Sequence, residues 1–169
     1  QAKLDALEEH PMLVSSIPSP VHSLHEHVKL LGNLENGRVK NVIAARSRIL
    51  QAIEGSHMDR YLIDSLELVA RGHELLGEIT TANHLHTLCI QHYQKIDDPV
   101  GEAFATLGSI ACALCNDQLP QAEKLLDRAL ETFSATSQLE GLFRCAWLET
   151  YICMLKNRRK EARAATEAI

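Results

Sequence analysis

Aromatic residues are scarce in this 169-residue chain, at 4% of the sequence, and alternating runs rich in valine, threonine and tyrosine are missing from it. A β-sheet domain takes much of its packing from such residues, so their scarcity argues against strands. Alanine, leucine, glutamate, arginine and isoleucine are abundant instead, which indicates an all-α protein. At this length the chain should form one domain of moderate size.

The sequence also lacks an excess of basic residues and a long apolar run. Its formal net charge is -5, which disfavours nucleic acid as a partner because neutralising phosphates needs concentrated lysine and arginine. No segment approaches the roughly 18 consecutive apolar residues of a membrane span, and no charged and then apolar leader opens the chain. We therefore expect neither a nucleic-acid nor a membrane partner.

Motifs of catalysis and cofactor binding are missing as well. The chain contains no glycine-rich phosphate loop, no Gly-x-Ser-x-Gly elbow and no His-Glu-x-x-His sequence. No pair of carboxylates has a sequence context that suggests opposed pKa values, which acid–base chemistry requires. The sequence thus predicts a protein that is not an enzyme and that needs no cofactor.

Five cysteines, an odd number, lie within apolar stretches where a free thiol behaves as a small buried side chain. This usage predicts a reducing, intracellular location in the cytoplasm or nucleus. Two of them form a Cys-x-x-Cys pair with the spacing of a redox or metal dithiol, but their predicted place among apolar helical residues favours core packing. A zinc site there would also need two further ligands. The five are Cys89, Cys112, Cys115, Cys145 and Cys153.

A 40-residue spacing runs through the second half of the chain and indicates an internal repeat. Matched residues on the two sides of this spacing are of the same type, apolar or small. Repeats of this length usually form helix pairs whose neighbours bury faces that one pair cannot bury alone. The matches are Ala82 with Ala122, Leu85 with Leu125, Ile90 with Leu130, Tyr93 with Phe133, Gly101 with Gly141, and Ala122 with Ala162.

Apolar periodicity and turn signals divide the chain into helices. Three prolines between residues 11 and 20 predict an extended stretch there, and Asp97-Asp98-Pro99 predicts a helix start with proline in the first turn. The predicted helices cover residues 2–9, 21–34, 38–54, 59–77, 81–94, 100–115, 120–136 and 139–155, and a last one starts near residue 159.

The tetrapeptide Gly55-Ser56-His57-Met58 matches the scar that cloning leaves before an insert. It divides the chain into an N-terminal helical segment, residues 1–54, and the repeats, residues 59–169. If the tetrapeptide is such a scar, the first segment is a fused or tethered partner, a second piece of the same protein, or a neighbouring chain. Against this, four residues before the tetrapeptide reproduce the spacing of a repeat helix: Ala45, Ile49, Ala52 and Ile53 match Ala122, Leu126, Ala129 and Leu130.

Leu107-Gly108 with Ala111, followed by Ala122, Leu126 and Ala129, resembles the tetratricopeptide repeat. The usual period of that family is about 34 residues. The 40-residue period of this chain is longer and is similar to that of scaffold subunits of the anaphase-promoting complex, of the cohesin loader and of bacterial MalT-type regulators. The resemblance implies a right-handed superhelix of antiparallel helix pairs, a TPR-like α-solenoid of three to four repeats. Departures are Trp147 at the Leu107 position, Thr166 at the Leu126 position, and His86 where an apolar residue is expected.

In that superfamily the first helix of each pair lines a concave groove, and carrying this groove over by position selects six residues of this chain. They are mostly small or apolar, which suits a helical or extended apolar segment of a partner protein better than a charged peptide terminus. The alternative is that these residues pack against the adjacent helix. The six are Ala105, Ser109, Cys112, Cys145, Glu149 and Ile152.

Clustered histidines raise the question of a metal site. His84, His86, Cys89 and His92 lie within nine residues, and two of them could share a metal. However, Cys89 aligns with Ala129 and should point inward, and the histidines should flank the buried stripe. The same reasoning holds for His22, His25 and His27, so we predict no metal.

One basic patch stands out near the C-terminal end: Arg158, Arg159, Lys160 and Arg163. Such a patch can contact an acidic partner, although charge runs at helix turns are usually solvated surface. Taken together, the sequence predicts a protein–protein interaction scaffold within a larger assembly. The alternative is a regulatory sensor domain that binds a peptide or small molecule inside the solenoid.

Overall fold

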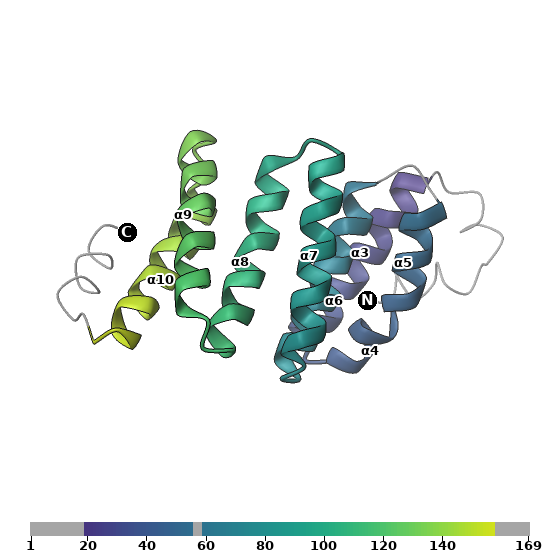
Figure 1. Ribbon diagram of the computed structural model, residues 1–169. Helices are drawn as coiled ribbons and strands as arrows, with labels where there is room; N and C mark the ends of the chain where they lie inside the picture. The colour runs from purple at the N-terminus through teal and green to yellow at the C-terminus, as the bar shows by residue number, and fades with distance from the viewer. Residues whose placement is uncertain (1–18, 56–58, 158–169) are drawn as a thin grey trace.

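The computed structural model describes residues 19–55 and 59–157, and within these ranges every regular element is an α-helix (Figure 1). This confirms the all-α prediction for the described part of the chain. The helices are α3 (Ser19–Glu35), α4 (Val39–Ala44), α5 (Arg46–Gly55), α6 (Arg60–Leu75), α7 (Ile79–Lys95), α8 (Pro99–Cys115), α9 (Leu119–Ala135) and α10 (Leu139–Leu155).

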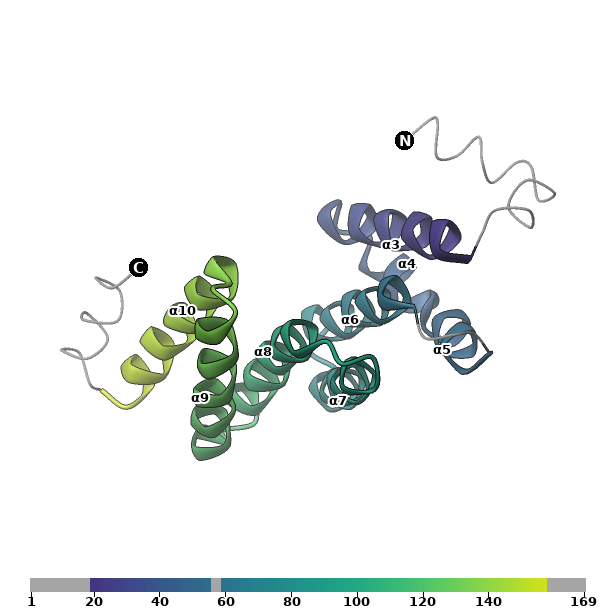
Figure 2. The ribbon, with the colours of Figure 1, turned by 90° about the horizontal axis from the view of Figure 1, so that it is seen from above.

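The helices form a row; from α6 to α10 each one packs mainly against its neighbours in sequence, whereas α3 and α4 pack chiefly against α6. Consecutive helices from α6 to α10 run in opposite directions, with α10 at one end of the row and α3 and α5 at the other (Figure 1). Seen from above, α3 and α7 lie on opposite sides of α6 (Figure 2). None of the helices in the described ranges has both the length and the apolar character needed to cross a membrane.

The connections between helices repeat with a spacing of 20 residues. After α6 to α9, the second residue beyond the helix adopts a left-handed backbone conformation, and the next N–H bonds back to a carbonyl five residues earlier, as in a Schellman cap. Gly77 has φ of 75°, and Asp97, Asp117 and Ser137 have φ of 55–56°. The closing bonds are Glu78 N to His73 O, Asp98 N to Tyr93 O, Gln118 N to Ala113 O and Gln138 N to Phe133 O, each 2.9–3.0 Å long. Two helices with their connections therefore make up the 40-residue spacing.

Residues 40 apart are buried at matching positions of successive helix pairs, and the match extends into α4 and α5. The buried series are Val42, Ala82 and Ala122; Ile49, Cys89 and Ala129; and Ile53, Tyr93 and Phe133. The sequence comparison matched Ala45 with Ala122 and was therefore three residues out of register. Counted from the structure, α3 to α5 follow the same spacing as the later helices.

Two glycines at the start of α8 and α10 give room to the aromatic rings that close the preceding helices. A Cβ atom at Gly101 would overlap the ring of Tyr93, and one at Gly141 would overlap the ring of Phe133. Both rings are buried. The glycine and the aromatic residue therefore recur together because they contact each other in each repeat.

Most predicted helix boundaries agree with the structure to within two residues, and two predictions need correction. The single helix predicted over residues 38–54 is interrupted at Ala45, whose N–H bonds to Val42 three residues back, a tighter turn than that of an α-helix. The extended stretch predicted over residues 11–20 is wrong for its last two residues, because Ser19 and Pro20 belong to α3 and proline is tolerated in a first helical turn; its other residues lie outside the described ranges. The helices predicted over residues 2–9 and from residue 159 lie outside the described residues.

The predicted cap at Asp97-Asp98-Pro99 is confirmed. The Asp98 carboxylate accepts a hydrogen bond of 2.9 Å from the N–H of Gly101, and Pro99 occupies the first turn of α8. Asp59 caps α6 in a similar way, accepting a bond of 3.0 Å from the N–H of Tyr61. Local sequence signals therefore set the start of both helices.

Candidate functional site

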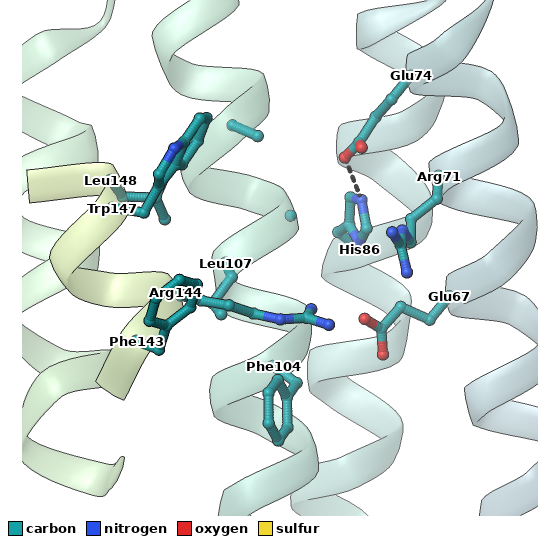
Figure 3. A pocket seen from close by; sticks show the side chains of 12 residues that line it. Glu67, Arg71, Glu74, His86, Phe104, Leu107, Phe143, Arg144, Trp147 and Leu148 are labelled. Carbon is teal, nitrogen blue, oxygen red and sulfur yellow. Dashed lines mark hydrogen bonds and ion pairs between the residues drawn. The ribbon is translucent and has the colours of Figure 1, made fainter. Parts of the chain in front are cut away.

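A pocket of about 450 Å³ opens between α6, α8 and α10, and we call it the inter-helix pocket (Figure 3). One wall is charged and comes from α6 and α7, with Arg144 reaching in from α10. The other wall is apolar and comes from α8 and α10. The charged residues are Glu67, Arg71, Glu74, His86 and Arg144, and the large apolar ones are Phe104, Leu107, Phe143, Trp147 and Leu148.

Arg144 links the two walls. Its guanidinium carbon lies 5.5 Å from the centre of the Phe104 ring, and it bonds Glu140 one turn earlier at 2.7 Å. In Figure 3 the guanidinium extends from α10 toward the carboxylate of Glu67. Burial raises the pKa of the Glu67 carboxyl, and the charges of His86, Arg71 and Arg144 only partly oppose this shift. The pocket therefore holds a carboxylate whose solvation is incomplete.

The apolar wall continues out of the pocket onto an exposed face of α10. Phe104 is anchored by the Phe133 ring, with centroids 4.9 Å apart, whereas Phe143 and Trp147 are 56% and 60% exposed. The rings of Trp147 and Tyr151 stack at 6.1 Å with an angle of 4° between their planes. The exposed apolar residues of this face are Leu139, Phe143, Trp147, Tyr151, Met154 and Leu155.

At the back of the charged wall, Glu74, His86 and Cys112 meet from α6, α7 and α8, and we call them the Glu74–His86–Cys112 cluster. One donor atom from each lies within 4.8 Å of the others. His86 Nε2 is 2.7 Å from Glu74 Oε1, and the Cys112 thiol lies 3.8 Å from the same oxygen. Burial, followed by the negative charge of Glu74, raises the pKa of the Cys112 thiol to about 12.

Gly108 makes room for this cluster. A Cβ atom at position 108 would overlap the imidazole of His86, which is completely buried. The Leu-Gly pair that suggested a tetratricopeptide repeat therefore has a local role here: it admits a histidine where the repeat favours an apolar residue.

The six residues predicted to line a groove lie elsewhere. Five of them are buried and only the sixth, Glu149, is exposed, so the alternative interpretation, packing against adjacent helices, describes the five better. The pocket is lined by Phe104, Gly108 and Ala111 instead. These precede the predicted positions by one residue, which turns the lining face by about 100° around the helix axis. The five buried residues are Ala105, Ser109, Cys112, Cys145 and Ile152.

The predicted basic patch, Arg158, Arg159, Lys160 and Arg163, lies outside the described residues. Its neighbour Lys156 is described and forms an ion pair with Glu123 of α9.

The histidines and the cysteine of α7 differ in how far their side chains are buried. Cys89 points inward as expected, with its thiol 3.8 Å from the carbonyl oxygen of Ile63. The expectation that the histidines flank the stripe is wrong for His86, which is fully buried, while His84 is exposed. In the described ranges, the Glu74–His86–Cys112 cluster is the one group of three or more side chains placed to share a metal.

The Cys-x-x-Cys pair is split as well. Cys112 is buried but Cys115 is exposed at the last residue of α8, so the prediction of core packing holds for the first cysteine only. Sequence reasoning missed the cluster because its members lie 12 and 26 residues apart. The available signal was His86 itself, a polar residue in an apolar repeat position that Leu126 occupies one repeat later.

Comparison of the chain with protein-family models, with curated proteins and with solved structures gives no match to any of them.

Proposed function

We propose that this chain is a protein-interaction module of the tetratricopeptide-like superfamily, in which successive helix pairs form a solenoid. The 20-residue spacing of the helix connections and the matched buried positions support this. Packing of each helix against its neighbours in sequence, as seen from α6 to α10, is typical of such repeat proteins.

The inter-helix pocket is the binding site of this module. A helical or extended segment of a partner protein places one large apolar side chain against Phe104, Leu107 and Trp147. The rest of the segment runs along the exposed face of α10. The observation that carries the proposal is the continuity of the pocket's apolar wall with that exposed face, because large exposed apolar patches mark interaction surfaces.

The charged wall sets the orientation of the bound segment. Arg71 and Arg144 supply guanidinium donors, and Glu67 supplies an acceptor on the same side. Polar groups of the partner backbone or of a flanking side chain pair with these residues. Anchoring by one apolar side chain, with polar contacts around it, is a common distribution of binding energy.

A displayed peptide library panned against the full chain tests this proposal. Enriched peptides should share one large apolar residue at a fixed position, and fluorescence anisotropy should show binding weakened at least about tenfold by Trp147→Ala. Leu75→Ala is the matched control, because Leu75 is 65% exposed but lies outside the pocket lining. Equal binding to Trp147→Ala and to the unchanged protein would refute the proposed site.

A sensor for a small molecule is the second candidate. It is favoured by the convergence of Glu67, Arg71, His86 and Arg144 on a cavity of about 450 Å³, within the usual size range of ligand pockets. A thermal-shift screen of small polar and aromatic compounds distinguishes the two functions. A sensor should yield a compound whose stabilising effect is lost in Arg71→Gln, whereas a peptide-binding module should yield none.

A further inference from the structure

The Glu74–His86–Cys112 cluster has the composition of a transition-metal site. We propose that it binds one Zn²⁺ ion through these three side chains, with the fourth coordination position open to the inter-helix pocket. This inference is independent of the proposed binding of a partner segment.

The donor set matches zinc chemistry. Thiolate sulfur, imidazole nitrogen and carboxylate oxygen are the three side-chain donors that zinc uses in proteins. A thiolate and a carboxylate together carry two negative charges, which balance the charge of the ion. Three protein ligands with one open position are typical of zinc sites that bind a water or an exogenous ligand.

The geometry requires only side-chain adjustment. Tetrahedral zinc with bond lengths of about 2.0–2.3 Å places donor atoms about 3.5 Å apart. The nitrogen–oxygen pair of His86 and Glu74 is 2.7 Å apart, and the sulfur–oxygen pair of Cys112 and Glu74 is 3.8 Å apart. An ion entering the cluster would therefore widen the first separation and leave the second nearly unchanged.

The nitrogen of His86 that faces the cluster is Nε2, which lies 2.7 Å from Glu74 Oε1. An ion coordinated by Nε2 would leave the other ring nitrogen, the buried Nδ1, as an N–H without a hydrogen-bond partner among the described residues, a group that a water molecule could satisfy. Because Gly108 has no Cβ atom, the His86 imidazole has room to occupy this position beside α8. Glu74 and His86 both line the pocket, which gives the ion a path of entry.

Binding exchanges one proton for the ion. The Cys112 thiol loses its proton to solvent as the sulfur–zinc bond forms, and the imidazole coordinates in its neutral form. The donors come from α6, α7 and α8, so one ion would join three successive helices. The bound state should consequently be more stable than the metal-free state.

Titration of the reduced full chain with Co²⁺ tests the site. One equivalent should produce the near-ultraviolet sulfur-to-cobalt charge-transfer band, and added Zn²⁺ should abolish it by displacement. Cys112→Ser should lose the band, whereas Cys115→Ser, three residues further along the same helix, should keep it. Glu74→Gln and His86→Gln should weaken Co²⁺ binding at least about tenfold, as expected when a ligand is lost.

Thermal unfolding followed by circular dichroism supplies a second readout and shows whether each variant folds. Zn²⁺ should raise the melting temperature of the unchanged protein and of Cys115→Ser but not that of Cys112→Ser. No band with the unchanged protein, or a band of equal strength in Cys112→Ser, would overturn the proposal. Dependence on Cys115 instead would identify adventitious binding at the exposed thiol.

Discussion

Gly141 is one of three glycines, with Gly101 and Gly108, at which a Cβ atom would overlap a buried ring. Replacing it with alanine would force a Cβ atom into the ring of Phe133, which is fully buried. Overpacking of this kind costs about 1–3 kcal/mol, so Gly141→Ala should lower the free energy of unfolding by about that amount in urea titrations.

Gly32 is the matched control for this substitution. It lies inside α3, and apart from its chain neighbours and the backbone of its own helix no atom is within 4 Å of the place where its Cβ would be. Alanine is favoured over glycine in a helix by about 1 kcal/mol, so Gly32→Ala should stabilise the protein or leave it unchanged. Similar losses in both variants would contradict the glycine–aromatic contact.

The raised pKa of Glu67 predicts how the stability of the fold depends on pH. Burial raises its folded pKa, so the unfolded chain loses this proton first as the pH rises. The protonated carboxyl makes its full contribution to the free energy of unfolding below about pH 4.3, the pKa of glutamate in an unfolded chain. This contribution is lost as the pH rises from that value through the raised pKa of the folded state. Glu67→Gln should therefore gain stability relative to the unchanged protein at pH 7 but not at pH 4.

Urea unfolding at several pH values measures this difference. Glu131→Gln, an exposed carboxylate of α9, serves as the control and should show little change between the two pH values. A Glu67→Gln variant that is less stable than the unchanged protein at pH 7 would show that the ionised carboxylate is stabilising, and would refute the prediction.

Single residues also mark where sequence reasoning reached its limit. Cys89 was correctly placed inward by its match with Ala129, because burial follows helix periodicity. The predicted groove residues of α8 are buried and the residues one position earlier line the pocket, since Phe104 and Ala105 both continue an apolar pattern and only packing decides which of them faces the pocket. The meeting of Glu74, His86 and Cys112 depends on contacts between three helices, which no local pattern encodes.

At the scale of single elements, the helix connections carry the clearest signal. Gly77 tolerates its left-handed conformation without strain, but Ser137 adopts φ of 55° with a side chain that disfavours it. Ser137→Gly should raise the melting temperature, corresponding to about 1 kcal/mol of stabilisation.

Ser134→Gly provides the comparison within the same segment. Ser134 is exposed in the last turn of α9 and is helical, so glycine there should lower stability by a few tenths of a kcal/mol to about 1 kcal/mol. The two substitutions remove the same atoms and should act in opposite directions. Destabilisation by both would argue against a strained connection after α9.

Helix positions were predictable because apolar periodicity, proline and aspartate caps all lie in the local sequence. The break at Ala45 was not, because residues 38–54 show an unbroken helical pattern and the interruption arises where α4 and α5 both pack against α6. Tertiary packing thus overrode a local preference.

At the scale of the molecule, packing between neighbours predicts that damage stays local. Hydrogen exchange followed by mass spectrometry should show faster exchange in α9 and α10 of Gly141→Ala, because Gly141 and Phe133 join these two helices. Exchange in α6 and α7 should change little, as expected where stability is a sum of neighbouring interfaces. Uniform acceleration would indicate one cooperative unit instead.

The regular 20-residue spacing of the helix connections limits how this chain can change in length. Adding one residue inside a helix turns everything beyond it by about 100°, so buried side chains would face water and exposed ones would face the core. Removing a full 40-residue segment that begins and ends in equivalent connections restores the original phase. Evolution or engineering can therefore lengthen or shorten this protein most readily by whole pairs of helices, because only such changes keep the buried faces of the remaining helices aligned.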